Sequence, residues 1–267
     1  MGRTLRLSEL QKRILVSVIF GPLLLLALWL QGYYTVILFA LISVAGSYEY
    51  FRMMGAGKWD YLWILYGLAL FISLITIRGY DLEIIWLTFL VLTLGALVGW
   101  NGGSSIPKAF KVAFGLFYTT VLPAMIVRIG LDHNGRPLLL VLVLMIWLVD
   151  STAYFVGMRF GKRRNLFSVS PNKSLEGFLA GMLAPAIVVI ILYMCKVDWL
   201  STREMVLIAV AAGIFGQLGD LLESMLKRYY GVKDSSKLIP GHGGVLDRTD
   251  SILLAGSFLY FALQILS

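Results

Sequence analysis

The sequence has little charge and almost no cysteine. Its single cysteine, Cys195, excludes an intrachain disulfide framework. Only 14% of the 267 residues are charged, whereas 59% are hydrophobic. Together with a mean hydropathy of +0.83, this shortage of charge excludes a soluble globular domain and indicates a polytopic membrane protein. No internal repeat or low-complexity tract is evident, and neither is a Ser-His-Asp or Cys-His constellation.

Apolar runs make up most of the sequence instead. Nine of them approach the ~20 residues that cross a bilayer as a helix, the form in which a chain in lipid satisfies its own backbone. We therefore predict an all-α, polytopic integral membrane protein with about nine transmembrane helices. Residues 1–137 should hold helices one to five, and residues 138–267 should hold catalytic helices six to nine with two charged loops, in one continuous bundle. The runs are residues 14–30, 35–51, 62–77, 84–100, 110–129, 138–158, 178–195, 205–227 and 252–266.

The distribution of basic residues predicts the orientation. In a soluble protein, a net charge of +8 would suggest a nucleic-acid partner. In a membrane protein the question is instead on which side of the membrane the basic residues lie, and we expect no nucleic-acid partner. With nine spans, most of the 23 Lys and Arg residues fall on the side of the N-terminus. The positive-inside rule then places the N-terminus and both charged loops in the cytoplasm. The basic start, with Arg3 and Arg6, lacks a following cleavage pattern, so we expect a retained anchor.

Polar residues concentrate between residues 216 and 250. On the apolar helix that begins this stretch, Gln217, Asp220, Ser224 and Lys227 follow at i, i+3, i+7 and i+10 and share one face. A charge inside an apolar membrane helix costs ~2.5–3.5 kcal/mol and marks a functional site by default. The stripe therefore indicates a polar cavity.

Two more parts complete this stretch. The loop 231–244 contains Pro240 and four glycines, so its backbone amides can approach a ligand closely. Asp247 and Asp250 stand just before the last apolar run. Carboxylates that hold a hard cation such as Mg²⁺, together with Lys, Arg and bare backbone, make a polyphosphate site.

A second polar segment joins the sixth and seventh runs. Asp150 and Tyr154 lie one helical turn apart, on a face that two glycines continue. After Pro171, Lys173 and Glu176 stand at a helix start, where they can reach a phosphate. The two polar segments are expected to support the same site.

Some of these residues also have an ordinary structural interpretation. Asp250, Asn172 and Ser174 suit helix capping. Lys227 and Arg228 suit interfacial anchoring at a helix end.

Five further residues also have an ordinary structural interpretation. Glu49, flanked by tyrosines near the end of the second run, suits the membrane interface as well as a site. His133 is expected to be a turn residue, and His242 either contacts a phosphate or shapes its loop. Arg163 and Arg164 suit a patch facing solvent or lipid headgroups.

The motif between residues 224 and 250 resembles the signature of the phosphatidate cytidylyltransferases, also called CDP-diacylglycerol synthases. A dozen fixed positions within 27 residues make a specific match. The segment 170–177 resembles another element of this family, in which Lys173 and Glu176 match and positions 172, 174 and 175 depart. The signature residues are Ser224, Lys227, Arg228, Lys233, Asp234, Pro240, His242, Gly243, Gly244, Asp247, Arg248 and Asp250.

The resemblance implies the reaction of CTP with phosphatidate to give CDP-diacylglycerol and pyrophosphate. The lipid phosphate, whose second pKa is about 6, attacks without a general base, so the enzyme has to align two anions and neutralise their charge. We predict that Mg²⁺, with a second cation possible, is held by Asp220, Asp247 and Asp250. The predicted catalytic residues are Asp220, Lys227, Asp247, Arg248 and Lys173. The predicted substrate-binding residues are Ser224, Lys233, Asp234, His242, Gly243, Gly244, Glu176 and Asp150.

Other functions stay open at this level. A cytidylyltransferase for an isoprenoid phosphate has the same needs, because nothing in the sequence selects the lipid tail. An ion or organic-anion transporter is the alternative from another class, with Glu49, Asp150 and Asp220 along an ion path, although it predicts repeats that are not evident. An inactive scaffold is a third possibility. The expected partners are CTP, phosphatidate and membrane lipids, and small-residue helix faces make a homodimer possible. The expected location is the cytoplasmic membrane, with the active site at its cytoplasmic face.

Overall fold

The computed structural model describes residues 9–132 and 137–266, with side chains from residue 18 onward. Arg3, Arg6 and His133 lie outside the described residues. Within these ranges the chain is helical and forms no β-strand, so the all-α prediction is confirmed. The helices are α1 (Glu9–Leu30), α2 (Tyr33–Met53), η1 (Lys58–Tyr61), α3 (Leu62–Thr76), α4 (Asp81–Val98), α5 (Ser105–Leu116), η2 (Phe117–Val121), α6 (Leu122–Asp132), α7 (Leu138–Phe160), α8 (Leu175–Met194), α9 (Thr202–Val210), η3 (Ala211–Gly216), α10 (Gln217–Tyr229) and α11 (Leu246–Ile265).

Seven helical stretches in the described ranges are long and apolar enough to cross a membrane. Two other predicted runs are also helical. The described side chains of α1 provide a shorter apolar segment, Val18–Leu30, and α11 begins with several charged residues. The membrane assignment is therefore supported, and the count of nine crossings stays a prediction. The seven stretches are Tyr33–Met53, Lys58–Thr76, Asp81–Val98, Gly102–Asp132, Leu138–Phe160, Leu175–Met194 and Thr202–Tyr229.

Two of these long helices contain a π-helical segment. η2 joins α5 to α6, and η3 joins α9 to α10. Such segments recur at functional sites because they break the regular hydrogen-bond ladder. Next to η3, the side-chain amide of Gln217 donates to the carbonyl oxygens of Gly213 at 2.7 Å and of Phe178 in α8 at 3.2 Å. This amide ties the beginning of α10 to α8.

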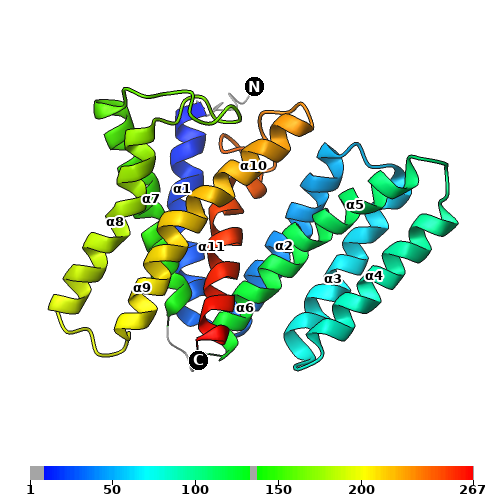
Figure 1. Cartoon of the computed structure of the whole chain (residues 1–267), viewed down its shortest axis with the longest axis horizontal. Coiled ribbons are helices and arrows are strands. Elements are labelled where there is room, and N and C mark those ends of the chain that lie inside the picture. The colour runs from blue at the N-terminus through cyan, green and yellow to red at the C-terminus, as the bar shows by residue number, and fades with distance from the viewer. Residues whose placement is uncertain (1–8, 133–136, 267) are drawn as a thin grey trace, which may run out of the picture.

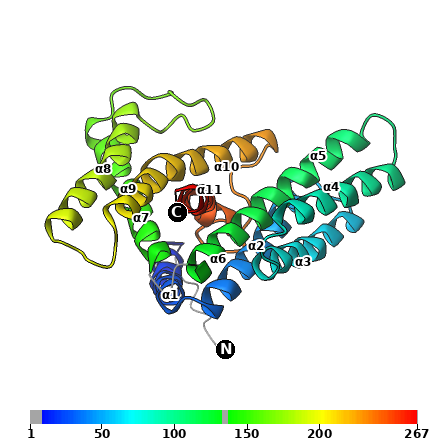
Figure 2. The same cartoon turned by 60° about the horizontal axis from the view of Figure 1, so that its bottom comes forward.

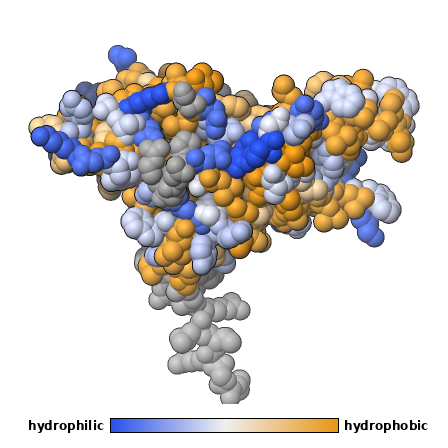
Figure 3. Space-filling model, turned by 90° about the horizontal axis from the view of Figure 1, so that it is seen from below, coloured by the Kyte–Doolittle hydropathy of each residue, from blue (hydrophilic) through white to orange (hydrophobic). Residues whose placement is uncertain are grey.

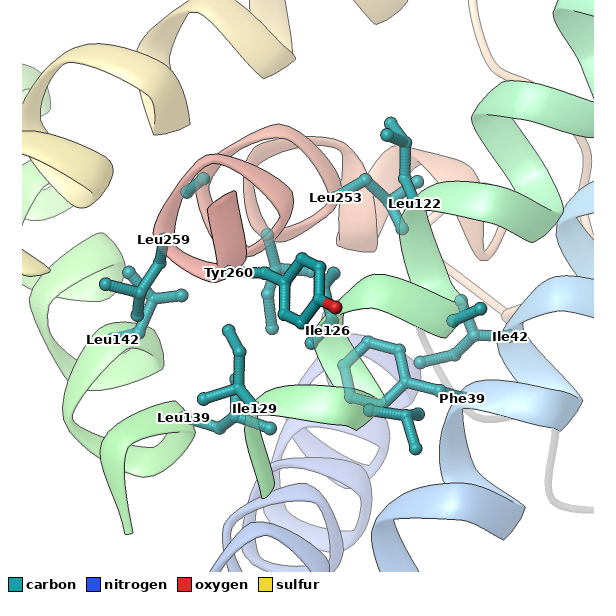
Figure 4. Packing of buried hydrophobic residues seen from close by; sticks show 14 of the residues in the cluster. Phe39, Ile42, Leu122, Ile126, Ile129, Leu139, Leu142, Leu253, Leu259 and Tyr260 are labelled. Carbon is teal, nitrogen blue, oxygen red and sulfur yellow. The ribbon is translucent and has the colours of Figure 1, made fainter. Parts of the chain in front are cut away.

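Helix α11 lies at the centre of the bundle. It packs against η3, α10, α6 and α7, and Figure 2 shows it nearly end-on among its neighbours. Its apolar side chains interlock with theirs, as Leu259 does with Leu142 of α7 and Leu253 with Leu122 of α6 (Figure 4). Because lipid tails are as apolar as leucine, these contacts stabilise the bundle by close packing rather than by removal from water.

Both charged loops lie at one end of the bundle. The connection from α7 to α8 and the connection from α10 to α11 are at the top of Figure 1, the end at which α1 begins, whereas α11 finishes at the bottom. Large apolar side chains remain exposed on the outer faces, and hydrophobic residues cover much of the face seen in Figure 3. Helix α4 has no buried residue at all. Such a surface suits a lipid environment, with the polar site at one end.

Candidate active site

A cavity of about 440 Å³ opens between α7, α8 and α10. Its wall includes Asp150 and Tyr154 of α7, Lys173 just before α8, and Gln217 and Asp220 of α10. These residues come from both polar segments of the sequence. The structure therefore brings the two segments to one cavity.

An ion pair between Lys173 and Asp220 joins the two segments across this cavity. The two side chains are 28% and 34% exposed, so both remain accessible to a ligand. Asp150 is exposed, and Asp220 and Lys173 both act on it electrostatically. One ammonium group thus serves two carboxylates on this side of the site.

The beginning of α8 is built by short-range hydrogen bonds. The hydroxyl of Ser174 accepts a bond from the backbone amide of Gly177 at 3.1 Å, which confirms the capping interpretation of Ser174. The Glu176 carboxylate accepts bonds from the backbone amides of Lys162 at 3.1 Å and Arg163 at 3.2 Å. Glu176 therefore ties the loop that follows α7 to the start of α8.

Lys227 connects α10 to α11. Its ammonium nitrogen lies 2.6 Å from a carboxylate oxygen of Glu223 and 2.6 Å from one of Asp247. The Lys227 side chain is only 14% exposed, so its interpretation as an interfacial anchor is wrong, whereas Arg228 is exposed. Two carboxylates share one ammonium group here as well, so this buried cluster has one more carboxylate than it has ammonium groups.

Glu223 is the candidate that the sequence analysis missed. It is fully buried, and its Oε1 atom has no hydrogen-bond partner among the described residues. A signal for it existed, because a carboxylate inside an apolar helix is as costly at position 223 as at Asp220. Glu223 follows Asp220 by three residues and precedes Lys227 by four, so it lies on the same face as the stripe that begins at Gln217, in which Ser224 was chosen in its place.

Asp247 is held on both of its oxygens. While Oδ1 faces Lys227, Oδ2 accepts bonds from the backbone amides of Ser235 and Gly244, each at 2.8 Å, and from the Ser235 hydroxyl at 2.7 Å. Gly243 has a φ of +88°, a conformation that favours glycine. The amide of Gly244 in the predicted phosphate-binding loop is thus used to hold Asp247.

The remaining predicted residues, on the loop and in the helices beside it, are more peripheral. Arg248 is exposed, and its guanidinium donates to the backbone carbonyl of His242 at 3.0 and 2.9 Å. A loop-shaping contact therefore exists at position 242, made by the backbone. Lys233 and Asp234 are exposed on the same loop, and Ser224 is half-buried in α10.

Asp250 lies inside α11 rather than at its N-cap. The helix begins at Leu246, and the Asp250 carboxylate accepts a bond from the amide of Ser251 at 2.7 Å, so the N-cap interpretation is wrong. A Cβ atom on Gly219 would collide with the Asp250 carbonyl oxygen, which shows how closely the backbones of α10 and α11 approach. The buried Asp250 carboxylate consequently interacts electrostatically with Glu223 and Asp220.

A tyrosine from η2 faces the same carboxylates. Tyr118 is buried, and its hydroxyl has no hydrogen-bond partner among the described residues. The carboxylates that act on it electrostatically are Asp250, Glu223, Asp220 and Asp247. The π-helical segment therefore turns a polar group toward the point where α10 and α11 meet.

The site contains oxygen atoms of the kind that a hard cation takes as ligands. Two buried polar atoms, Glu223 Oε1 and Tyr118 Oη, lack partners among the described residues, and surplus carboxylate surrounds Lys227. Within the described ranges, no three His, Cys, Asp or Glu side chains converge on one point as a complete metal cage. Mg²⁺ does not need such a cage, because one or two carboxylates plus substrate phosphates usually hold it.

Comparisons with known proteins agree with the motif. The profile of the cytidylyltransferase family matches residues 11–266. A phosphatidate cytidylyltransferase of Haemophilus influenzae is 32% identical over 281 aligned positions, which cover 94% of this chain and 98% of that protein. One of Brucella abortus is 32% identical over 269 positions, covering 95% and 93%. One of Bacillus subtilis is 44% identical over 138 positions, and this match spans about half of each chain, 52% and 51%. The prediction drawn from the signature is thereby confirmed, and the chain belongs to the cytidylyltransferase family.

Proposed function

We propose that this chain is a phosphatidate cytidylyltransferase, which converts CTP and phosphatidate to CDP-diacylglycerol and pyrophosphate. The observation that carries the proposal is the cavity in which Lys173 and Asp220 meet. It joins the two polar segments within a helical bundle whose outer faces suit lipid. Relatives that match over nearly the whole chain carry the name of this activity.

The substrates themselves provide the reacting groups. The phosphate of phosphatidate is largely ionised near neutral pH, because its second pKa is about 6, and it attacks the α-phosphorus of CTP. The new P–O bond forms as the bond to the β-phosphate breaks and pyrophosphate leaves. Two anions must approach each other for this step, so the protein has to supply positive charge and alignment.

Lys173 and Lys227 are suited to supply that charge. Each is held next to a carboxylate, Asp220 in one case and Glu223 with Asp247 in the other. A triphosphate is a stronger partner for an ammonium group than a shared carboxylate is. Transfer of the lysines to the phosphates then leaves carboxylate oxygens free.

Those oxygens are the proposed ligands of Mg²⁺. Asp220 and Asp247 would hold the ion, with Asp250 and Glu223 beside them. When bound, Mg²⁺ would neutralise negative charge on the triphosphate and polarise its phosphoryl oxygens. The exposed Lys233 lies on the adjoining loop and the exposed Arg248 in the first turn of α11, where they can meet the leaving pyrophosphate or the entering nucleotide.

The place of the site in the bundle fits a reaction between a lipid and a water-soluble nucleotide. Both charged loops lie at one end of the helices, and we assign that end to the cytoplasm, where CTP is available. The acyl chains of the lipid stay in the bilayer while its phosphate reaches the cavity at the interface.

The direct test is incubation of the purified protein with labelled CTP, Mg²⁺ and a panel of lipid phosphates. We expect label to enter CDP-diacylglycerol when phosphatidate is present, together with an equal amount of pyrophosphate. If label is transferred only to an isoprenoid phosphate, that compound replaces phosphatidate as the proposed lipid substrate. Transfer to none of the panel, by protein that is monodisperse and thermally stable, would overturn it.

The loop that Glu176 ties to α8 leads to a smaller prediction. In Glu176→Gln, an amide nitrogen faces the backbone N–H groups of Lys162 and Arg163, so at least one hydrogen bond is lost. We expect the KM for CTP to rise roughly fivefold, as the loss of one such bond would give, with little change in kcat. Steady-state kinetics checks this, and a fall in kcat at unchanged KM would contradict it.

A further inference from the structure

Glu49 of α2 is fastened to the loop that precedes α11. Its carboxylate is completely buried, so its interpretation as an interfacial residue is wrong. Oε1 accepts bonds from the Ser236 hydroxyl at 2.6 Å and the Val245 amide at 2.8 Å. Oε2 accepts bonds from the Leu246 amide at 2.9 Å and the Ser235 hydroxyl at 3.0 Å. All four donors come from the segment between α10 and the first residue of α11.

This arrangement caps α11 from a different helix. The first amides of a helix have no acceptor within that helix, and its N-terminus carries partial positive charge. Val245 and Leu246 provide two of these amides, and the residue at the N-cap position, Val245, has no side-chain acceptor of its own. The carboxylate of Glu49 takes the place of the missing cap.

The same carboxylate is linked to Asp247 through one serine. The Ser235 hydroxyl lies 3.0 Å from Glu49 Oε2 and 2.7 Å from Asp247 Oδ2. A Cβ atom on Gly244 would lie 2.6 Å from both Glu49 oxygens, so only glycine allows this approach. Glu49, Ser235 and Asp247 therefore form a continuous chain of contacts that ends at Lys227.

The anchor is itself rigid. The next residue of α2, Tyr50, is buried and its hydroxyl donates to the backbone carbonyl of Lys111 in α5 at 2.9 Å. A separate bond on this turn joins the Ser47 and Thr119 hydroxyls at 2.7 Å, faces η2 and does not reach the loop. A carboxylate held in this way transmits the position of α2 to the loop.

We infer that Glu49 is a positioning residue for cytidylyl transfer, which sets the orientation of the Asp247 carboxylate through Ser235 and the capped start of α11. It touches neither substrate. The inference rests on the proposed function, because Asp247 is assigned there to the Mg²⁺–CTP site. It also gives the N-terminal helices a part in a site whose recognised motifs all lie after residue 146.

The test begins with Glu49→Gln, which keeps the size of the side chain. Its amide nitrogen would face hydrogen-bond donors, so two of the four bonds are lost. Partners that orient metal ligands typically contribute 10–100-fold in metal affinity or activity. We expect kcat to fall about 10–100-fold and the Mg²⁺ concentration for half-maximal activity to rise about tenfold. The KM for the lipid should stay within twofold, and Glu49→Asp, which keeps the charge, should recover part of kcat.

Two matched variants separate positioning from stability. Ser235→Ala removes the link between the carboxylates and should reproduce the Mg²⁺ shift. The double variant with Glu49→Gln should then be less than additive, since both changes break one chain. Ser47→Ala removes a buried hydrogen bond on the same turn of α2 without touching the loop, and should lower the Tm while leaving the Mg²⁺ dependence unchanged. Equal Mg²⁺ shifts in Ser47→Ala and Glu49→Gln would show a merely structural role and overturn the inference.

A second readout does not depend on turnover. Amide hydrogen exchange over residues 243–247 should accelerate at least tenfold in Glu49→Gln and stay at the parent rate in Ser47→Ala. Unchanged exchange in Glu49→Gln would refute the positioning role even in an active enzyme. If the parent protein transfers no cytidylyl group and Glu49→Gln still exchanges faster than the parent, the result supports the positioning of Asp247 and counts against the proposed function.

Discussion

Replacing Asp247 by asparagine is expected to lower kcat about a thousandfold while the protein stays folded. In the parent, Glu223 and Asp247 share the ammonium group of Lys227, so the cluster has one more carboxylate than it has ammonium groups. The substitution removes one carboxylate, which is also a proposed Mg²⁺ ligand. It leaves Glu223 to neutralise Lys227, and it keeps a carbonyl oxygen for the donors on the loop. Because no buried charge loses its only partner, the cost in stability should be about 1 kcal/mol.

The measurement is transfer from labelled CTP at saturating phosphatidate and Mg²⁺, per mole of monodisperse protein. Asp198→Asn is the matched control, since Asp198 is exposed between α8 and α9, at the opposite end of the bundle. We expect it to keep the parent's turnover. If Asp247→Asn retained more than a tenth of that turnover, Asp247 would have no place at the reacting phosphates.

Removing divalent cations is expected to stop the reaction altogether. Lys173 and Lys227 are both paired with carboxylates, so the protein alone has little free positive charge inside the site. A triphosphate and a lipid phosphate brought there without a metal ion would repel each other and the surplus carboxylates. In excess EDTA, transfer should fall to the rate of a protein-free mixture, and added Mg²⁺ in excess of the chelator should restore it.

The control for this experiment is EDTA saturated beforehand with Mg²⁺, which should leave the rate unchanged. Asp220→Asn should raise the Mg²⁺ concentration needed for half-maximal rate if any turnover remains. Full activity in metal-free EDTA would refute the proposed Mg²⁺ site, while leaving the family assignment untouched.

Helical structure could be predicted from local sequence because lipid leaves so few alternatives. A long apolar run has to become a helix in the bilayer, and each of the nine predicted runs coincides with a helical stretch, although four of them extend one or two residues past its C-terminal end. The π-helical segments η2 and η3 were not predictable in this way. Gln217, directly after η3, bonds to a carbonyl oxygen of α8, and no periodicity within one run reports such a partner.

The candidate site was only partly predictable for the same reason. Lys173 and Asp220 stood out as charges next to apolar helices, and the structure pairs them. Glu223 and Glu49 drew less attention, because the significance of a single carboxylate depends on what surrounds it. Burial distinguishes them from interfacial carboxylates, and burial is decided by the packing of α2, α10 and α11.

By itself, the sequence determined that the chain is helical and that it is a membrane protein. It also contains the short motif that places the chain in its family. These properties follow from composition and spacing along the chain, which folding does not change. The tertiary structure alone decided which lysine pairs with which carboxylate and that Glu49 caps a helix almost two hundred residues later in the chain. Such contacts depend on distances between helices that the order of residues does not contain.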